Sequence, residues 1–462
     1  MSDCDWRQLG DVAEIITGFP FKSNLYAESS EGIRLLRGDN VVQGALRWEN
    51  AKFWSHSNLI ERHGKYWLRC DDVVLAMDRP WIEAGLKTSR VSSLDLPSLL
   101  VQRVACLRAK EGVDQAYLAS VIASRSFVEY VKGVQTGTAV PHISSRQISE
   151  FKFRLPALNE QRAIGSFVRL FDEKIDLSRQ INQTLESIAQ ALFKSWFVYF
   201  DPVLDNALAA GNAIPEPLRG RATARQALGD ARKPLPEEIR REFPDAFEFR
   251  GEMGWVPRGW EAGSILSCAQ LLSGGTPKTT VSEYWGGDVL WASAKDVSQC
   301  AGVALLSTER KISAAGLENS AAKIIDAFSS VVVSRGATTG RIVALGQAMA
   351  INQTCYALQS LTGQPWYLFS KLKQDINRFT VSAHGSVFDT ITTRTFESTS
   401  VLLPQVAQCS HFEKKIEGVY AAIISRSRSI NVLMRLRDTL LPKLLSGELT
   451  IPAAEKLAAD VL

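Results

Sequence analysis

The chain has 462 residues, of which 45% are hydrophobic and 22% are charged, and its formal net charge is +4. This length exceeds what one hydrophobic core usually organises, so we expect two or more domains, and the ordinary composition excludes a disordered or fibrous chain. No apolar run is long enough to cross a membrane and no signal peptide opens the sequence, so a soluble cytoplasmic protein is expected.

The two halves of the chain resemble each other, which indicates an internal repeat. The run GTAVPHISSR, which starts at Gly137, is matched by GSVFDTITTR, which starts at Gly385, 248 residues further on. Earlier runs match in the same order: Asp72–Leu75 with Ser330–Val333, and Leu99–Val104 with Met349–Thr354. We therefore predict two diverged copies of one unit.

Each copy begins with a mixed α/β segment, because short β-rich runs alternate with Gly, Asp and Asn and one helical stretch follows them. In the first copy we expect strands over Ile33–Leu36, Val73–Ala76 and Leu99–Leu107, and a helix over Tyr117–Val131. In the second copy we expect strands over Val289–Trp291, Val331–Ser334 and Ala350–Leu358, and a helix over Trp366–Phe379.

A long helix closes each copy. From Asn159 to Val198 and from Gln408 to Leu445, apolar residues recur at the heptad spacing that is typical of a coiled-coil seam. Polar Ser178 and Asn182 interrupt the first stripe. Since the register matches in both copies, we predict that the two helices pair antiparallel; two unrelated surface helices are the alternative. The predicted seam residues are Ile164, Val168, Phe171, Ile175, Leu185, Leu192, Trp196, Phe412, Ile416, Val419, Ile423, Ile430, Leu433, Leu440 and Leu444.

Between the copies, residues 201–254 are rich in Pro, Ala, Gly and alternating charge, which predicts a partly ordered linker. The expected fold class is α/β (α+β), with two tandem α/β domains joined by two long antiparallel helices in a pseudo-twofold arrangement. The predicted boundaries are 1–156 for the first domain, 157–200 for its helix, 255–404 for the second domain and 405–462 for its helix and tail.

Several runs of the sequence resemble the specificity subunits of prokaryotic type I restriction-modification systems. The helix from Gln180 to Val198, the Asp201-Pro202-Val203 that follows it, and the closing run Leu440–Leu449 resemble the conserved helices of this family. Gly274-Gly275-Thr276-Pro277, followed by Tyr284-Trp285-Gly286-Gly287, resembles the start of one of its target recognition domains.

The resemblance implies a DNA-binding protein without catalysis of its own. Each target recognition domain would read one half of a bipartite, asymmetric sequence in double-stranded DNA, and the helices would hold the domains apart. Methylation (M) subunits would dock on the helices, and restriction (R) subunits would join that complex.

The residues themselves offer no pattern for catalysis, a metal or a cofactor. There is no Pro-Pro dipeptide of a methyltransferase motif and no Gly-x-x-x-x-Gly-Lys-Ser/Thr loop of an ATPase. The seven cysteines show no C-x-x-C spacing, and the five histidines lie in no ligand cluster. Two alternatives stay open: a methyltransferase with unrecognised motifs, and a coiled-coil scaffold without a DNA role.

The loop after the middle predicted strand of each copy is the first candidate for DNA contact. In the second copy it reads SRGATTGR, where glycines allow a close backbone approach while arginines and hydroxyls offer hydrogen-bond donors. A solvated hairpin loop is the alternative. The matching loop of the first copy differs, as expected if the domains read different sequences. The candidates are Arg79, Trp81, Lys87 and Arg90 in the first copy, and Ser334, Arg335, Thr338, Thr339 and Arg341 in the second.

A Gly-Thr/Ser turn before the last strand of each copy is the second candidate, although its hydroxyls could merely cap the next segment. Lysines beside the Gly-Pro turns, and the lysine before Asp296, are further candidates, with ordinary solvated charges as the alternative. The candidates of these two groups are Thr138, His142, Arg146, His384, Ser386 and Arg394, together with Lys22, Lys278 and Lys295.

Overall fold

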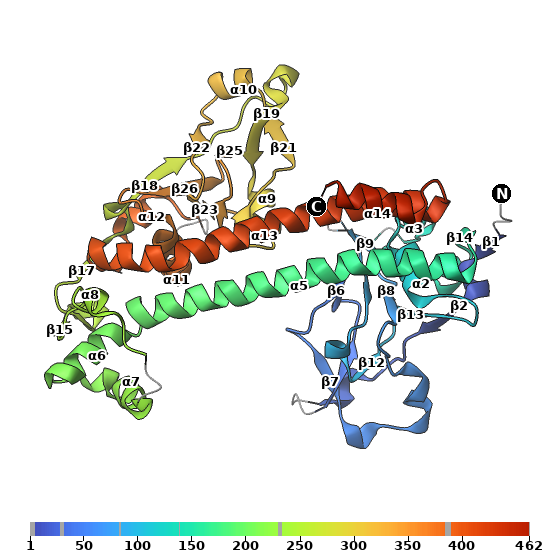
Figure 1. Ribbon diagram of the computed structural model, residues 1–462, viewed down its shortest axis with the longest axis horizontal. Coiled ribbons are helices and arrows are strands. Elements are labelled where there is room, and N and C mark those ends of the chain that lie inside the picture. Colours follow the sequence, from blue (N-terminus) through green and yellow to red (C-terminus); the bar gives the residue numbers. More distant parts are fainter. Residues whose placement is uncertain are drawn as a thin grey trace. The chain divides into compact units, whose positions relative to one another are not determined.

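The computed structural model describes residues 5–27, 32–82, 85–137, 139–229, 233–383 and 390–461. The chain forms two compact units. Unit 1 comprises residues 1–176 and 431–462, and unit 2 comprises residues 177–430. Two long helices, α5 (Leu158–Phe197) and α13 (Val406–Ser446), therefore contribute one part to each unit (Figure 1).

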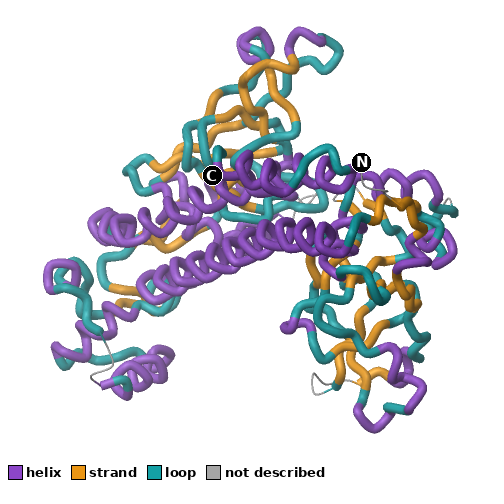
Figure 2. The backbone as a smooth tube through the Cα atoms, turned by 45° about the vertical axis from the view of Figure 1, so that its right-hand side comes forward, coloured by secondary structure: helices purple, strands orange, loops and turns teal. Residues whose placement is uncertain are grey.

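Unit 1 contains two four-stranded sheets. The segments drawn in orange in Figure 2 include the strands of both sheets. The first has the order β11–β8–β13–β2 and is antiparallel, and the second has the order β12–β4–β7–β3 with β12 and β4 parallel. All four residues of the central strand β8 are buried. The strands of the two sheets are Ala13–Thr17 (β2), Tyr26–Ala27 (β3), Ile33–Leu36 (β4), Lys52–Trp54 (β7), Val73–Ala76 (β8), Thr88–Arg90 (β11), Ser98–Leu100 (β12) and Val104–Ala109 (β13).

Three short strand pairs and five helices complete unit 1. The pairs are Asp5–Gln8 with Lys152–Leu155 (β1, β14), Val41–Val42 with Ala45–Leu46 (β5, β6), and Trp81–Ile82 with Gly85–Leu86 (β9, β10). The helices are Leu9–Val12 (α1), Gln115–Ala123 (α2), Arg125–Val134 (α3), Ser145–Ser149 (α4) and Ile451–Ala459 (α14). The single helix expected over Tyr117–Val131 is wrong: Ser124 ends α2, and its Oγ accepts a hydrogen bond from Phe127 N that begins α3.

Unit 2 contains a five-stranded sheet, β18–β26–β23–β24–β20, and a four-stranded sheet, β21–β19–β25–β22. Their strands are Ala269–Ser273 (β18), Trp285–Ala292 (β19), Ala304–Leu305 (β20), Arg310–Ile312 (β21), Ile324–Ile325 (β22), Ser330–Val333 (β23), Ile342–Leu345 (β24), Met349–Ile351 (β25) and Cys355–Ser360 (β26). Two strand pairs are Phe247–Phe249 with Trp255–Pro257 (β15, β16) and Glu261–Ser264 with Ser400–Leu403 (β17, β27). The domain helices are Ala294–Gln299 (α9), Ala314–Glu318 (α10), Pro365–Ala383 (α11) and Thr393–Ser398 (α12).

The strand pairing confirms the predicted duplication. Strand β8 lies between β13 and β11, as β23 lies between β26 and β24, and the parallel pair β4–β12 corresponds to β19–β25. The single strands expected over Leu99–Leu107 and Ala350–Leu358 are each two strands, because the chain leaves one sheet and enters the other between them.

The two long helices pair antiparallel, as predicted. In unit 2, Asn182 Nδ2 donates to Ile423 O at 3.3 Å and to Ser427 Oγ at 3.1 Å, while Phe193 contacts Phe412 at 5.6 Å between ring centroids. In unit 1, Arg437 Nη1 donates to Asp172 Oδ1 at 2.7 Å. Every predicted seam residue is buried or half-buried.

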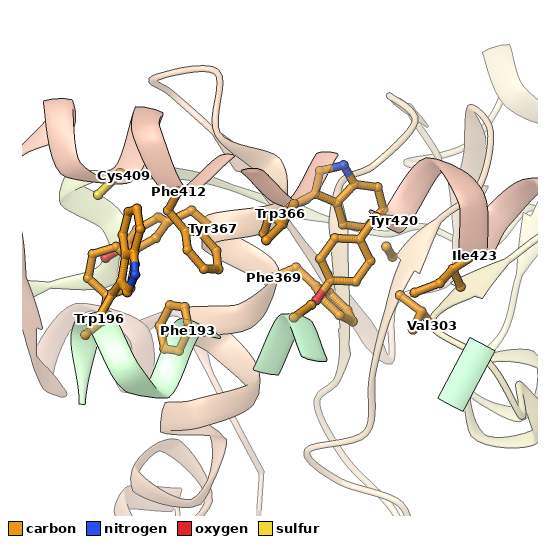
Figure 3. Packing of buried hydrophobic residues seen from close by; sticks show 14 of the residues in the cluster. Phe193, Trp196, Val303, Trp366, Tyr367, Phe369, Cys409, Phe412, Tyr420 and Ile423 are labelled. Carbon is orange, nitrogen blue, oxygen red and sulfur yellow. The ribbon is translucent and has the colours of Figure 1, made fainter. Parts of the chain in front are cut away.

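An aromatic cluster packs the second domain onto the helix pair in unit 2 (Figure 3). Trp366 of α11 stacks on Tyr420 of α13 at 4.2 Å, and Tyr367 packs edge-on against Phe197 of α5 at 5.1 Å. Aromatic side chains bury a large apolar area, so this cluster contributes strongly to the stability of unit 2.

The segment between the copies is more ordered than the predicted linker. It forms helices Asp201–Ala210 (α6), Glu216–Ala227 (α7) and Glu237–Arg240 (α8), and Phe243 packs against Trp196 at 5.3 Å. Asp201 is 3% exposed and accepts from Arg221 Nη2 at 2.7 Å. Some charged residues of this segment therefore form internal ion pairs and are not solvated as in a linker.

Within these described ranges, no helix is long and apolar enough to span a membrane.

Candidate nucleic-acid interface

In both units, the loop after the central strand meets the segment before a short helix. In unit 1, Ile143 N donates to Met77 O at 2.9 Å, and in unit 2, Ile391 N donates to Ser334 O at 2.8 Å. We call this feature the loop junction: residues 77–80 with 141–144 in unit 1, and residues 334–341 with 390–392 in unit 2. The two candidate loops that the sequence suggested separately are thus side by side within each unit.

The helix after each loop junction is capped in the same way. Ser144 accepts from Gln147 N before α4, and Thr392 accepts from Thr395 N before α12. A capping hydroxyl satisfies a backbone N–H that the helix leaves unpaired. The hydroxyls of Ser144 and Thr392 therefore cap the following helices, which is the alternative that the sequence left open for this turn.

In unit 1, the loop junction holds a mixed group of charges. Asp78 Oδ1 lies 2.6 Å from His142 Nδ1, and Asp78 Oδ2 lies 3.7 Å from Arg103 Nε. Arg79 has an exposed side chain, and its backbone N donates to Pro141 O at 2.6 Å. Burial lowers the pKa of Lys87 from its ordinary value; Asp39 and Asp78 oppose this shift and Arg79 adds to it.

Other candidates of unit 1 have structural partners. Arg90 Nε lies 3.4 Å from Asp71 Oδ1 with its side chain only 24% exposed, so it belongs to an internal ion pair. Trp81 carries Lys132 Nζ above its ring at 4.3 Å, and Arg146 pairs with Glu150 at 2.8 Å while staying exposed. Lys22 is exposed before a short 3-10 turn, whereas Thr138 lies outside the described residues.

In unit 2, Arg335 is an exposed cation of the loop junction, next to Gly336, whose φ is +100°. Arg341 Nη2 donates to Cys300 O at 2.7 Å, and the hydroxyls of Thr338 and Ser298 lie 2.6 Å apart. Thr339 Oγ1 donates to Gly336 O at 2.7 Å, which stabilises the turn.

Ser334 does not fit the prediction that it contacts DNA. Its side chain is buried, with 3% of the residue exposed, and its Oγ donates to Thr354 O at 2.9 Å. Because this residue directly follows β23, it continues the buried face of that strand. Its backbone serves the loop junction, and its hydroxyl is not available to a ligand in this structure.

Three further candidates of unit 2, Lys278, Lys295 and Arg394, are exposed. Lys295 pairs with Glu309 at 3.0 Å, and Lys278 is exposed while its carbonyl accepts from Trp285 Nε1 at 3.2 Å. Arg394 is exposed on α12. His384 and Ser386 lie outside the described residues.

Sequence reasoning missed Arg103 and Asp78. Arg103 is 61% exposed and adopts a left-handed backbone with φ +69° between β12 and β13. Left-handed turns are usually signalled by glycine or asparagine, and an arginine inside an apolar run gives no such signal. Asp78 was part of the candidate loop, but only the fold shows that it joins the second loop through His142.

In the part of the chain that the structure describes, no group of three or more His, Cys, Asp or Glu side chains could hold a metal ion. The exposed groups of the loop junctions are arginines and hydroxyls, and a histidine and a carboxylate of unit 1 are partly exposed. Such groups form hydrogen bonds with base edges and phosphates in protein–DNA complexes.

Comparison with known proteins agrees with this architecture. A family model described as "Type I restriction modification DNA specificity domain" matches residues 1–187 and 257–416, one match for each copy. The type I restriction enzyme HindI specificity subunit of Haemophilus influenzae is 30% identical over 357 residues, which are 72% of this chain and 77% of that protein. The EcoAI specificity subunit of Escherichia coli is 30% identical over 187 residues, 40% of this chain and 31% of that protein.

A solved structure supports the fold. The S subunit of a type I restriction-modification system from M. genitalium superposes with a TM-score of 0.52 at 13% identity, covering 96% of this chain and 97% of that one. Two copies of one α/β domain, each followed by a long helix, define a two-domain recognition protein. Since the family model matches well over half of the chain, the chain belongs to the family of type I restriction-modification specificity subunits.

Proposed function

We propose that this chain is the sequence-recognition subunit of a type I restriction-modification complex and that each domain reads one half of a bipartite DNA target. Beyond family membership, the observation that carries the proposal is the loop junction. Its backbone hydrogen bond is the same in both units, yet its side chains differ. A common backbone with different donors and acceptors is what two domains need in order to read different base sequences.

Within this proposal, side chains of the loop junctions contact bases. They are the exposed Arg79 and the half-buried His142 in unit 1, and the exposed Arg335, Thr338 and Arg341 in unit 2. The exposed cations outside the junctions, Lys22, Arg146, Lys278 and Arg394, contact phosphates and set the register on the duplex.

The chain itself performs no catalysis in this proposal. Methylation subunits dock on the long helices and carry out the chemistry, and restriction subunits join them. On α5, the apolar side chains of Leu170, Leu177 and Ile188 are 65%, 58% and 53% exposed, respectively, and offer surface to such partners.

Exchange of one recognition domain tests the proposal. Residues 1–156 are replaced by the matching domain of a related subunit, and the variant chain is expressed with its methylation subunits. Methylome sequencing should show one changed half-site and one unchanged half-site, because each domain reads independently. A host without the chain is the control and should lack the bipartite methylation.

Two outcomes would contradict this reading. If both half-sites changed together, the two domains would not read DNA separately. If the purified chain alone methylated DNA with S-adenosylmethionine, it would be an enzyme rather than a recognition subunit.

A further inference from the structure

Two arginines with left-handed backbones lie close together in unit 1: Arg79 belongs to the loop junction, and Arg103 is hydrogen-bonded to it through its carbonyl. Only five non-glycine residues in the described ranges have a positive φ, and Arg79 (+46°) and Arg103 (+69°) are two of them. Such conformations are unfavourable for residues with a Cβ atom and persist where the surrounding structure imposes them, most often at functional sites.

Comparison with unit 2 shows that the framework does not need the strained backbone at Arg103. In unit 1, Met77 N donates to Arg103 O at 2.8 Å. In unit 2, Ser334 N donates in the same way to Thr354 O at 2.9 Å, and Thr354 is not among the described residues with a positive φ. Strand pairing makes Thr354 the counterpart of Arg103, one residue away from the match that the sequence suggested, because Val104 pairs with Ala76 as Cys355 pairs with Val333. The same backbone bond forms without a left-handed residue, so this bond by itself does not require the left-handed turn at Arg103.

The side chain of Arg103 is accessible and oriented. It is 61% exposed, and its Nε lies 3.7 Å from Asp78 Oδ2. The other oxygen of Asp78 lies 2.6 Å from His142 Nδ1, which fixes the carboxylate between the two loops. The guanidinium is thus directed by a carboxylate that is itself held in place.

The charges around Arg103 favour base recognition over a phosphate contact. The carboxylate of Asp78 lies beside it, with Asp78 Oδ2 3.7 Å from Arg103 Nε. Carboxylates weaken the positive potential that attracts phosphate. A planar guanidinium with parallel N–H donors instead matches the O6 and N7 acceptors of guanine in the major groove.

We propose that Arg103 reads a guanine in the half-site of the first domain, with Asp78 as its positioning residue. This inference rests on the proposed function above and adds a specificity-determining residue to it. It also predicts that this half-site contains a G·C pair at the position that Arg103 reaches.

The test compares Arg103→Gly and Arg103→Gln with the wild-type chain, each expressed in full length with its methylation subunits. Glycine adopts the left-handed backbone freely, so Arg103→Gly should keep or raise the melting temperature while removing the side chain. Methylome sequencing should show a roughly 5- to 150-fold weaker preference for guanine at one position, since one bidentate contact is lost. Arg103→Gln should lose the same preference and gain adenine, with which glutamine pairs.

Arg69→Gln is the matched control. Arg69 is an exposed arginine of the same domain, and it precedes β8, whereas the loop junction follows that strand. The Arg69→Gln variant should direct methylation of the same motif as the wild-type chain. The second half-site should stay unchanged in all variants.

The proposal is overturned if guanine preference persists in both Arg103 variants. It is also overturned if both variants lower methylation equally at all sequences and reduce the salt dependence of DNA binding by about one charge, which indicates a phosphate contact. Failure of the proposed function looks different, because the wild-type chain would then direct no bipartite methylation.

Discussion

The two units attach their recognition domains to the long helices in different ways, although both descend from one repeat. In unit 1, α2 lies so close to α5 that a Cβ atom on Gly165 would be 2.6 Å from Tyr117 N. In unit 2, the position 248 residues later is Glu413, whose carboxylate accepts from Trp366 N at 3.1 Å and from Tyr367 N at 2.8 Å. At this position, unit 1 has a glycine without a side chain, whereas unit 2 has a glutamate whose carboxyl group is buried.

The domain helices that pack on α5 and α13 explain why both kinds of attachment are stable. Helix α2 is capped by its own Asp114, which accepts from Tyr117 N at 2.9 Å, so it needs no cap from α5. Helix α11 begins with Pro365 and receives its cap from α13 instead. A helix N-terminus requires acceptors for its first N–H groups, but not acceptors from a particular element. Both units therefore attach a domain helix to a long helix, but the groups that make the contact differ.

The largest effect is expected from Phe412→Ala in unit 2. Phe412 is fully buried and contacts Phe193, Trp196 and Phe197. Its removal should lower the free energy of unfolding by about 3–5 kcal/mol, because a large cavity opens in the core. Urea denaturation measures this loss, and hydrogen exchange should place it mainly in residues 177–430. Lys415→Ala, at an exposed site of the same helix, should change stability by less than about 0.5 kcal/mol.

A pH effect should distinguish the two attachments. Burial raises the pKa of Glu413 to about 7, above its ordinary value of 4.5. The folded state therefore binds the proton more tightly, and the stability that this provides at low pH is lost as pH rises from about 4.5 through about 7.

Glu413→Gln should flatten this pH dependence, which amounts to at most about 3 kcal/mol across the window. The measurement is the urea midpoint of unit 2 between pH 4.5 and 7.5. Glu397→Gln, at an exposed site of α12 in the same unit, should leave the dependence as it is. An unchanged pH profile in Glu413→Gln would show that this carboxyl group does not titrate in that range.

Gly165→Ala tests the close approach in unit 1. The added Cβ would collide with backbone atoms of α2, so we expect a loss of about 1–3 kcal/mol, as for other overpacked sites. Gly418→Ala is the matched control on α13, where no atom lies within 4 Å of the added Cβ. It should stabilise the helix by up to about 1 kcal/mol. Equal effects of the two substitutions would mean that α2 moves away from α5 at little cost.

The smallest effect on the folded chain, but a clear one on DNA, is expected from Arg335→Ala. A base contact would cost about 1–3 kcal/mol of binding and relax one position of the second half-site. A phosphate contact would weaken binding at all sequences and reduce the salt slope by about one charge. The first half-site is the internal control. If binding and methylation stay unchanged, Arg335 lies in a solvated loop without contact to DNA.

Elements with a strong local pattern could be predicted from the sequence. Strand β4 coincides with the expected Ile33–Leu36, β8 coincides with Val73–Ala76, and the heptad stripe located the seam of both long helices. Hydrophobic periodicity reports which face of an element is buried, and that is a property of neighbouring residues in the chain.

The order of the segment between the copies could not be predicted in this way. Its composition resembles a linker, yet Asp201 pairs with Arg221 and Asp205 pairs with Arg225, twenty residues apart in both cases. Ion pairs between helices leave no periodic apolar signal, so polar residues that pack internally look like solvated ones.

The sequence by itself determined the repeat, the two α/β domains, the paired helices and the family, because these depend on patterns that recur along the chain. Only the tertiary structure brought the two candidate loops of each unit into one junction, buried Ser334, and placed Arg103 beside Asp78 and His142. Arg103 and His142 lie 25 and 64 residues from Asp78 in the chain. Contacts over such separations are decided by how strands and loops pack, and no local pattern of residues encodes them.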